Sequence, residues 1–409
     1  MADFSPPDNN NRADQRGVEK SGKVADFRYR PPSQSKTPSA KRSLGDARNG
    51  QKPNSTSTKP SFQAARGKPA HRRQAYAALD LGTNNCRLLI ARPSGENFTV
   101  IDAFSRVVRL GEGLAMSGRL SDEAMERTLG ALKVCAEKLR RRNVHLARSV
   151  ATEACRRASN GPAFIEQVRK ETGIVLDIIT AEEEARLAVL GCHILLEGGE
   201  GQAVIFDIGG GSTELILIEP GGKIPRIIDW QSVPWGVVSL TDTVGRCTGT
   251  REERLERYAE MRRVVAGSFA PFAKRIAKHA NQGEEIRLLG TSGTVTTLAS
   301  LHLELPHYDR REVDGLIVPS QAMRDISTRL SGMSLEERGE LPCIGPDRAD
   351  LVVAGCAILD SILDIWPAER LGVADRGIRE GILRSLMAAD AEGERHRMEM
   401  RGLEIRNAK

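Results

Sequence analysis

One pattern occurs twice in the sequence and constrains the fold more than any other feature. Residues 75–95 (AYAALDLGTNNCRLLIARPSG) and 201–222 (GQAVIFDIGGGSTELILIEPGG) each contain an apolar strand, a turn with glycine and a second apolar strand. Asp80 and Asp207 close the first strand of each copy and lie 127 residues apart. Matching strands on both sides of a matching turn predict a duplicated α/β unit.

The segments after each copy alternate between expected strands and expected helices, which indicates two α/β domains. We predict a first domain over residues 74–198 and a second over residues 199–389, with the last helix free to pack back on the first domain. Residues 390–409 are expected to form a charged C-terminal tail. The main helices are expected at 121–142, 161–172, 182–196, 251–279, 293–302, 319–331, 346–364 and 377–389.

Residues 1–73 differ in composition from the rest of the chain. They hold 16 Lys and Arg against 6 Asp and Glu, a net charge of +10, together with 8 of the 19 prolines. The remaining 336 residues carry a net charge of −4, so the overall excess of +6 belongs to this segment. Such a segment cannot bury enough apolar surface to fold, and we predict a disordered basic tail. It is either a solvated tail without a partner or a segment that attracts polyanions.

The composition also excludes several classes of protein. No apolar run reaches the roughly 18 residues of a membrane helix, and the first residues lack the apolar core of a secretory signal. The seven cysteines are scattered and form no CxxC pair, which is typical of reduced thiols in a cytoplasmic protein. The seven histidines form no zinc-ligand cluster with them. The sequence leaves the oligomeric state open, a homodimer included.

The glycine turns carry the chemistry that the sequence suggests. Backbone N–H groups of a glycine-rich turn can surround phosphate oxygens, because no Cβ prevents close approach. The turn D-I-G-G-G-S-T-E (207–214) is bracketed by Asp207 and Glu214, whose carboxylates suit Mg²⁺. A third turn, G-T-S-G-T-V-T-T-L-A (290–299), follows an expected strand and opens a helix. Three such turns indicate a cleft that binds a polyphosphate-like anion.

The arrangement resembles the actin-like ATPase superfamily, and within it the exopolyphosphatase/guanosine pentaphosphate phosphohydrolase (Ppx/GppA) family. The residues that carry this resemblance are DLGTNNCRLLI (80–90), VRLGEGL (108–114), ATEACRRASN (151–160), EEEARLA (182–188), FDIGGGSTEL (206–215), GTSGTVTTLA (290–299) and DRGIREGIL (375–383). The resemblance implies two ribonuclease-H-like domains with a cleft between them. It is closest to the short form, because no His-Asp metal motif of the longer relatives occurs. The basic tail is not part of the family pattern.

The resemblance also implies roles for individual residues. The first Glu of an E-E-A-R pattern is Glu183, the expected catalytic base, with Glu184 as the adjacent alternative, and the active-site arginine corresponds to Arg156. The residues expected to bind phosphate are Gly82, Thr83, Asn84, Asn85, Gly209, Gly210, Gly211, Ser212 and Thr213. Asp80, Asp207 and Glu214 fall where the family places Mg²⁺ and phosphate contacts. Asn85 departs from the family pattern, which has a hydroxyl residue there.

The expected activity is that of a Mg²⁺-dependent exopolyphosphatase, in which water attacks the terminal phosphoryl group of polyphosphate and releases orthophosphate. Guanosine pentaphosphate is the alternative substrate, since it also presents a terminal phosphoanhydride. A different class also stays open, namely an actin-like nucleotide-binding sensor or kinase with little hydrolysis.

Overall fold

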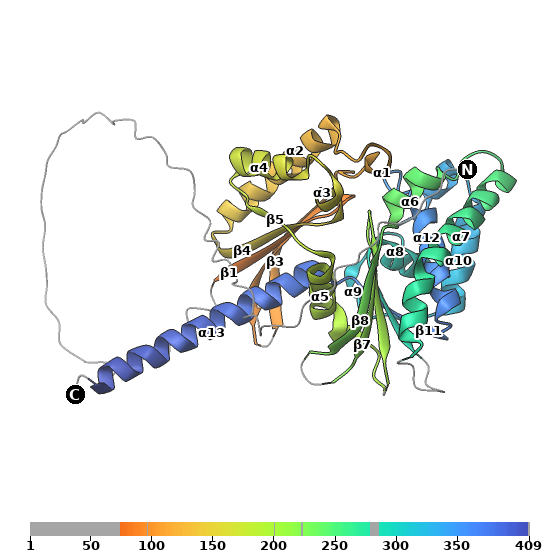
Figure 1. Cartoon of the computed structure of the whole chain (residues 1–409). Helices are drawn as coiled ribbons and strands as arrows, with labels where there is room; N and C mark the ends of the chain where they lie inside the picture. Colours follow the sequence, from red (N-terminus) through yellow and green to blue (C-terminus); the bar gives the residue numbers. More distant parts are fainter. Residues whose placement is uncertain (1–73, 96, 200, 222–223, 279–285, 408–409) are drawn as a thin grey trace, which may run out of the picture.

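The computed structural model of the protein describes residues 74–95, 97–199, 201–221, 224–278 and 286–407. The expected basic tail over residues 1–73 therefore lies outside the described residues. The described chain folds into two α/β halves, each built around one β-sheet (Figure 1). No helix in these ranges is long and apolar enough to cross a membrane.

The two sheets share one strand order over five strands, and the second sheet has one additional edge strand, which agrees with the predicted fold class. The strands of the first half are β1 (Ala75–Leu81), β2 (Asn85–Ser94), β3 (Asn97–Val107), β4 (Val144–Ala151) and β5 (Leu176–Ile178), in the order β3-β2-β1-β4-β5. Those of the second half are β6 (Ala203–Ile208), β7 (Thr213–Glu219), β8 (Arg226–Val233), β9 (Arg287–Thr291), β10 (Ile317–Pro319) and β11 (Arg370–Ala374), in the order β10-β11-β9-β6-β7-β8. In each sheet the first strand pairs antiparallel with the next strand in sequence and parallel with the fourth. β6 thus occupies in the second sheet the position that β1 occupies in the first.

Helices cover both sheets. The first half contains α1 (Leu114–Ser117), α2 (Asp122–Arg141), α3 (Glu153–Arg157), α4 (Gly161–Thr172), α5 (Ala181–Cys192) and the 3₁₀ turn η2 (His193–Leu195). The second half contains α6 (Val237–Val244), α7 (Arg251–Ile276), α8 (Gly293–His302), α9 (Arg310–Val313), α10 (Ser320–Gly332), α11 (Leu335–Glu340) and α12 (Val352–Ile365). The last helix is α13 (Ile378–Asn407). The elements that the sequence did not predict are α1, α3, α6, α9, α11, β8, β10 and β11. In addition, α12 begins six residues later than expected.

The alternation of side chains along β1 assigns the two faces of the first sheet. Ala77 and Leu79 point into a core shared with α2 and α4, whereas Tyr76 and Ala78 point into a core on the opposite face. Residues of α13 close that second core, and Ile382 is among its fully buried members. The final helix of the chain therefore packs against the first strand.

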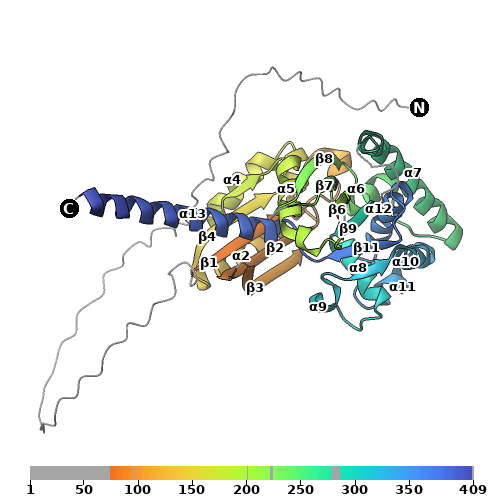
Figure 2. The same cartoon turned by 90° about the horizontal axis from the view of Figure 1, so that it is seen from below.

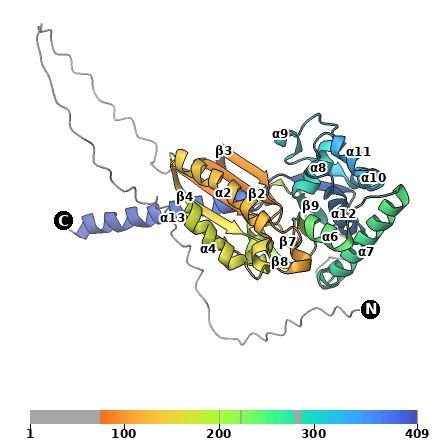
Figure 3. The same ribbon diagram turned by 90° about the horizontal axis from the view of Figure 1, so that it is seen from above.

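The expected charged tail from residue 390 is instead the continuation of α13 to Asn407. The helix leaves the body of the protein and projects outward (Figures 2 and 3). Its outer part is rich in Ala, Glu, Arg and Met, which have high helix propensity. Acidic and basic residues also recur there at spacings of three and four, which stabilises a helix without tertiary contacts.

Ion pairs join the two halves at a distance from the sheets. Asp350 in the second half accepts hydrogen bonds from Arg109 Nη1 at 3.2 Å and from Arg109 Nη2 at 3.3 Å. Asp242 accepts one from the Gly113 N–H at 2.9 Å. Arg246 Nη2 lies 3.6 Å from the Asp350 carboxylate as well. These contacts hold the α1 region of the first half against α6 of the second.

Candidate active site

A cavity of about 140 Å³ lies where the glycine turns of the two halves meet. The β1–β2 turn contributes Asp80 and residues 82–85, and the β6–β7 turn contributes residues 207–212. Both turns are closed in the same way, because the Gly82 N–H donates to Asn85 O and the Gly209 N–H to Ser212 O, each at 2.9 Å. The two copies of the sequence pattern therefore form two similar turns that line the same cavity.

The two turns touch each other through glycines. A Cβ on Gly210 would lie 3.0 Å from both the backbone N of Asn84 and the Cβ of Thr83, and one on Gly211 would lie 2.6 Å from Thr83 Oγ1. The approach of the two backbones therefore requires glycine at these positions. The backbone N–H groups of the turns are thereby brought to a common cavity, which is the arrangement that binds phosphate oxygens.

The third turn predicted from the sequence, at the start of α8, completes the wall of the cavity. Ser292, Gly293, Thr294 and Thr297 line it. Ser292 has a backbone φ of 132°, an unfavourable conformation for a residue with a side chain. Its hydroxyl oxygen is buried without a hydrogen-bond partner in the described chain. A strained backbone and an unsatisfied hydroxyl at one residue indicate a group that is held for a ligand.

Five acidic side chains line the same cavity: Asp80, Glu153, Glu184, Asp207 and Glu214. Burial and the nearby Glu214 carboxylate raise the pKa of Asp207 to about 8. Burial likewise raises the pKa of Asp80 and of Glu214. Glu214 is held by hydrogen bonds from Ser212 Oγ at 2.8 Å and Ser232 Oγ at 2.9 Å. Crowded carboxylates of this kind favour either a shared proton or a bound cation.

The three carboxylates predicted to hold Mg²⁺ supply the oxygen ligands that this cation prefers. Oδ1 of Asp80 is buried and accepts no hydrogen bond from the described residues, so it is free for a ligand. No group of three or more His, Cys, Asp or Glu arranged around a metal position occurs in the described ranges. Mg²⁺ usually takes only one or two carboxylates and completes its shell with water and substrate phosphates. The donor set agrees with that mode of binding rather than with a closed protein cage.

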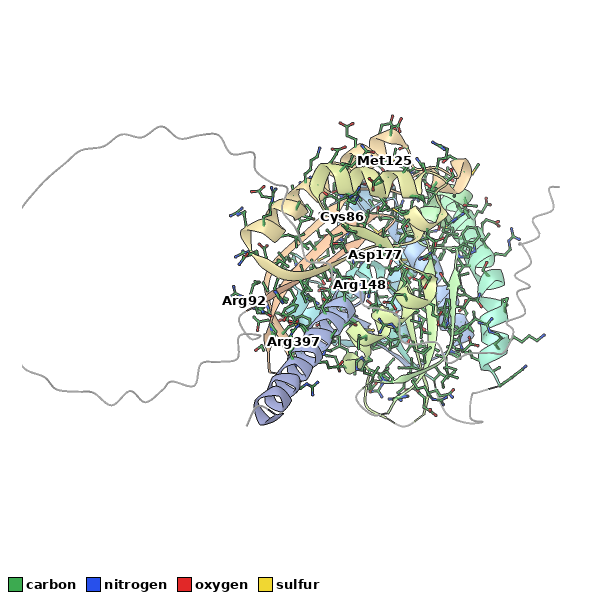
Figure 4. The ribbon with its side chains drawn as sticks, turned by 60° about the vertical axis from the view of Figure 1, so that its left-hand side comes forward. Cys86, Arg92, Met125, Arg148, Asp177 and Arg397 are labelled. Carbon is green, nitrogen blue, oxygen red and sulfur yellow. The ribbon has the colours of Figure 1, made fainter. Side chains whose placement is uncertain are left out.

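Glu183 and Glu184 lie on different sides of α5. Glu184 is 6% exposed and lines the cavity, whereas Glu183 does not line it. The Glu183 carboxylate accepts hydrogen bonds from Arg186 on the same helix and from Arg148 Nη1, the latter at 2.8 Å. Arg148 in turn lies beside Asp177 (Figure 4). Burial alone would raise the pKa of Glu183, but the hydrogen bonds from these two arginines lower it. Glu183 is thus an ion-paired carboxylate outside the cavity.

The environment of Glu184 is the opposite. Burial and the nearby Glu214 carboxylate raise the pKa of Glu184 well above its ordinary value, and Arg156 opposes that rise. Arg156 Nη1 donates to Glu184 Oε2 at 3.0 Å and to Ile179 O at 2.8 Å, and its Nε donates to Glu153 Oε2 at 3.1 Å. Arg156 does not line the cavity but fixes Glu184 and Glu153, which both do.

Two arginines that the sequence did not indicate supply positive charge to the cavity. Arg87 and Arg348 both line it, and a Cβ on Gly293 would lie 3.8 Å from Arg87 Nη2 and 3.9 Å from Arg348 Nη1. Neither guanidinium has a hydrogen bond or ion pair with another described residue. Arg87 lies two residues after the β1–β2 turn on β2, and this spacing is the signal by which it could have been found.

The structure brings together most of the residues predicted for the site. The predicted residues that line the cavity are Asp80, Gly82, Thr83, Asn84, Asn85, Asp207, Gly209, Gly210, Gly211, Ser212 and Glu214. Those that do not are Arg156, Glu183 and Thr213. Thr213 is fully buried, and its hydroxyl donates to Trp235 O. Side-chain Oδ1 atoms of Asn84 and Asn85 are buried without a partner in the described chain, which leaves both amides available to a ligand.

Comparison with known proteins identifies relatives over most of the chain. The family model described as "Ppx/GppA phosphatase family" matches residues 89–390. Exopolyphosphatase 2 of Mycobacterium tuberculosis is 31% identical over 324 residues, which cover 76% of this chain and 98% of that protein.

Solved structures agree with this result. The Ppx/GppA family member of Aquifex aeolicus is 29% identical with a TM-score of 0.62, over 78% of this chain and 98% of the other. An exopolyphosphatase of Cytophaga hutchinsonii shares the fold at 24% identity, with a TM-score of 0.68 over 77% of this chain and 98% of the other. From the duplicated turns, the cavity between them and these similarities, the chain belongs to the Ppx/GppA phosphatase family.

Proposed function

We propose that the protein is an exopolyphosphatase that hydrolyses the terminal phosphoanhydride bond of inorganic polyphosphate and releases orthophosphate. The observation that carries the proposal is the meeting of two glycine turns from two like sheets at a cavity that also contains a buried, arginine-held glutamate. The similarity to a protein named exopolyphosphatase 2 supports it. The cavity volume of about 140 Å³ suits the end of a chain rather than a whole large ligand, whose pockets span roughly 300–1,000 Å³.

In this proposal the base is Glu184 rather than Glu183. A water molecule beside the Glu184 carboxylate loses its proton to that carboxylate as its oxygen bonds to the terminal phosphorus, and the bond from phosphorus to the bridging oxygen breaks. A raised pKa makes Glu184 a stronger base, and the hydrogen bond from Arg156 fixes its orientation. Arg156 is thereby a positioning residue.

The phosphate oxygens are bound by the backbone N–H groups of the two turns, and Arg87 and Arg348 balance their charge. Asp80, Asp207 and Glu214 would hold Mg²⁺, which when bound neutralises charge on the phosphoryl oxygens. Burial raises the pKa of all three carboxylates, which favours a bound cation or a proton over an uncompensated negative charge.

The test is orthophosphate release by the purified chain from long-chain polyphosphate, with and without Mg²⁺. Parallel reactions with guanosine pentaphosphate and with ATP separate the three activities that the sequence leaves open. We expect Mg²⁺-dependent release that is fastest with polyphosphate. Faster release from guanosine pentaphosphate would reassign the substrate. Binding of ATP without turnover of any of the three would instead indicate a nucleotide-binding sensor.

A further inference from the structure

Two buried cysteines of the first half lie in direct contact. The Sγ atoms of Cys86 and Cys135 are 3.9 Å apart, although 49 positions separate the two residues in the sequence. Cys86 belongs to β2 and Cys135 to α2, and both side chains are fully buried in the core between the first sheet and the helices that cover it (Figure 4). All seven cysteines are among the described residues, and no other two of them have sulfur atoms in contact there.

Cys86 lies between two residues that line the cavity. The β1–β2 turn closes at Asn85, whose carbonyl accepts the Gly82 N–H, and Arg87 follows Cys86 on β2. Because side chains alternate along a strand, Asn85 and Arg87 face the cavity whereas Cys86 points into the core behind it. A shift of the Cys86 backbone would therefore displace the closing residue of a glycine turn on one side and a cavity arginine on the other.

A covalent bond between the two sulfur atoms would produce such a shift. The sulfur atoms of a disulfide are about 2.05 Å apart, so the gap in this pair must close by roughly 2 Å. Rotation about the Cα–Cβ bonds supplies part of this movement, and approach of β2 and α2 supplies the rest. We propose that Cys86 and Cys135 form an oxidative modification site, at which formation of a disulfide displaces the β1–β2 turn and weakens the binding of anions in the cavity.

The oxidant of this reaction is a peroxide. Hydrogen peroxide converts one thiol to a sulfenic acid, and its second oxygen leaves as water. The sulfur of the other thiol then bonds to the sulfenic sulfur, the S–OH bond breaks, and the hydroxyl leaves as water with the proton of that thiol. The two sulfur atoms are oxidised by two electrons in total, and the peroxide is reduced to two molecules of water. A dithiol such as dithiothreitol reverses the modification by exchange.

Burial limits the rate of this reaction. The hydrogen bond with Cys135 and burial raise the pKa of the Cys86 thiol, so little thiolate is present in the closed structure. The pair therefore reacts when local opening separates α2 from β2 and admits the peroxide. We expect a response over minutes to hours of sustained oxidation rather than within seconds. This inference goes beyond the proposed function, since it concerns the control of anion binding and not the reaction.

A purely structural role is the alternative explanation of the contact. Cysteine packs in protein cores as a small apolar residue with a weak S–H donor. That role predicts that both thiols persist under peroxide. It also predicts that the effect of peroxide on anion binding is the same with and without Cys135. Oxidation of the wild type and of a variant without Cys135 therefore separates the two explanations.

The experiment treats the full chain with hydrogen peroxide at neutral pH. Peptide mass mapping measures the fraction of chains with a bond between Cys86 and Cys135, and titration calorimetry measures the Kd for tripolyphosphate before and after treatment. We expect the disulfide to form and the Kd to rise about tenfold, which corresponds to the loss of one hydrogen bond to a charged ligand. Dithiothreitol should restore the original Kd.

Cys135→Ala is the decisive variant, because it removes one sulfur atom and leaves the residues that line the cavity in place. Cys356→Ala is the matched control, since Cys356 is a fully buried cysteine of α12 without a sulfur neighbour in the described chain. Peroxide should raise the Kd of the wild type and of Cys356→Ala, and it should leave the Kd of Cys135→Ala unchanged. Melting temperatures verify folding, and Cys86→Ala replaces Cys135→Ala if the latter does not fold.

Each outcome decides the proposal. Thiols that persist at both positions overturn it, and so does a disulfide that leaves the Kd unchanged. An equal rise of the Kd in Cys135→Ala assigns the effect to another group and also overturns it. A reduced chain that binds no tripolyphosphate overturns both this proposal and the proposed function. A chain that binds tripolyphosphate in this redox-dependent way but releases no orthophosphate upholds the modification site and overturns the proposed function alone.

Discussion

Replacement of Glu184 by Gln tests the chemistry of the cavity most directly. Gln has nearly the same shape, and its amide oxygen can accept the hydrogen bond that Arg156 Nη1 now donates at 3.0 Å. The change removes a negative charge whose neighbours include Glu214 and Asp80. It therefore removes the capacity to accept a proton while leaving the packing of a 6% exposed side chain in place.

The structure sets the expected magnitudes. The hydrogen bond from Arg156 to Gln keeps its charged donor and loses only the charge of the acceptor, so we expect a loss of roughly 1 kcal/mol. Relief of repulsion among the buried carboxylates offsets this loss, and we expect the free energy of unfolding to change by no more than about 1 kcal/mol. Loss of a general base lowers kcat by about 10²–10⁴. The effect on catalysis, roughly 3–5 kcal/mol, should far exceed the effect on stability.

The assay is the steady-state rate of orthophosphate release, with urea unfolding measured in parallel. Glu183→Gln is the matched control, because Glu183 precedes Glu184 on α5 and pairs with Arg148 and Arg186 outside the cavity. Its kcat should stay within about twofold of the wild type, since a partly exposed ion pair contributes about 1 kcal/mol or less to stability. A Glu184→Gln variant that retains more than half the activity while Glu183→Gln is inactive would refute the reasoning.

Three further predictions concern the turn, the first half and the tail. Gly210→Ala should raise KM and should lower the melting temperature only slightly, because the new Cβ would lie 3.0 Å from Asn84 N at the edge of the cavity. A fall in the melting temperature with unchanged KM would mean that the turn is purely structural. Lys138 and Arg142 hold the pKa of Asp102 at about 2, so the stability from this carboxylate is present above pH 3.8 and is lost as pH falls towards 2. Asp102→Asn should cost about 1–2 kcal/mol at pH 7 by urea unfolding, and the cost should fall steeply between pH 3.8 and 2 and vanish below the folded-state pKa of about 2; a constant difference contradicts this. Deletion of residues 1–73, which carry a net charge of +10, should raise KM for long polyphosphate at low salt only and leave kcat unchanged. The measurement is kcat/KM against salt concentration for both chains. Superimposable curves would show that the segment does not attract the substrate electrostatically.

The fold was predictable because its signal is local and repeated. The strands before Asp80 and Asp207, and the glycine turns after them, are short-range patterns that tertiary contacts do not override. The shared order of five strands in the two sheets then follows from the duplication. The segment after residue 390 was not predicted as helix, since a highly charged stretch resembles a tail unless its helix propensity is weighed separately.

The residues of the site that lie in turns could be predicted from the sequence. Which glutamate of α5 faces the cavity could not, because that depends on how the helix is oriented about its own axis. Successive residues of a helix point about 100° apart, so neighbouring glutamates cannot both face the cavity. A signal was present, because Glu184 shares a face with the buried Leu187 and Ala188, and Glu183 is spaced to pair with Arg186. Arg348 carries no such local signal, since it reaches the cavity only through the packing of the second half.

The packing of α13 on the first strand has a consequence for the order in which the protein folds during synthesis. The larger core of the second half uses residues no later than Val373, and from the final helix only Ile378 packs against its second core. The first half, although made first, covers Tyr76 and Ala78 only in part, with Ile179 and Leu187, until Ile382 and Leu383 have been made. Met387 is the last residue of this core to be made. At about 5–20 residues per second, the ribosome takes roughly 10–40 s to advance from the end of α5 to that point. We therefore expect the N-terminal half to be the last part of the chain to reach its native state, and the part that relies on chaperones in the interval.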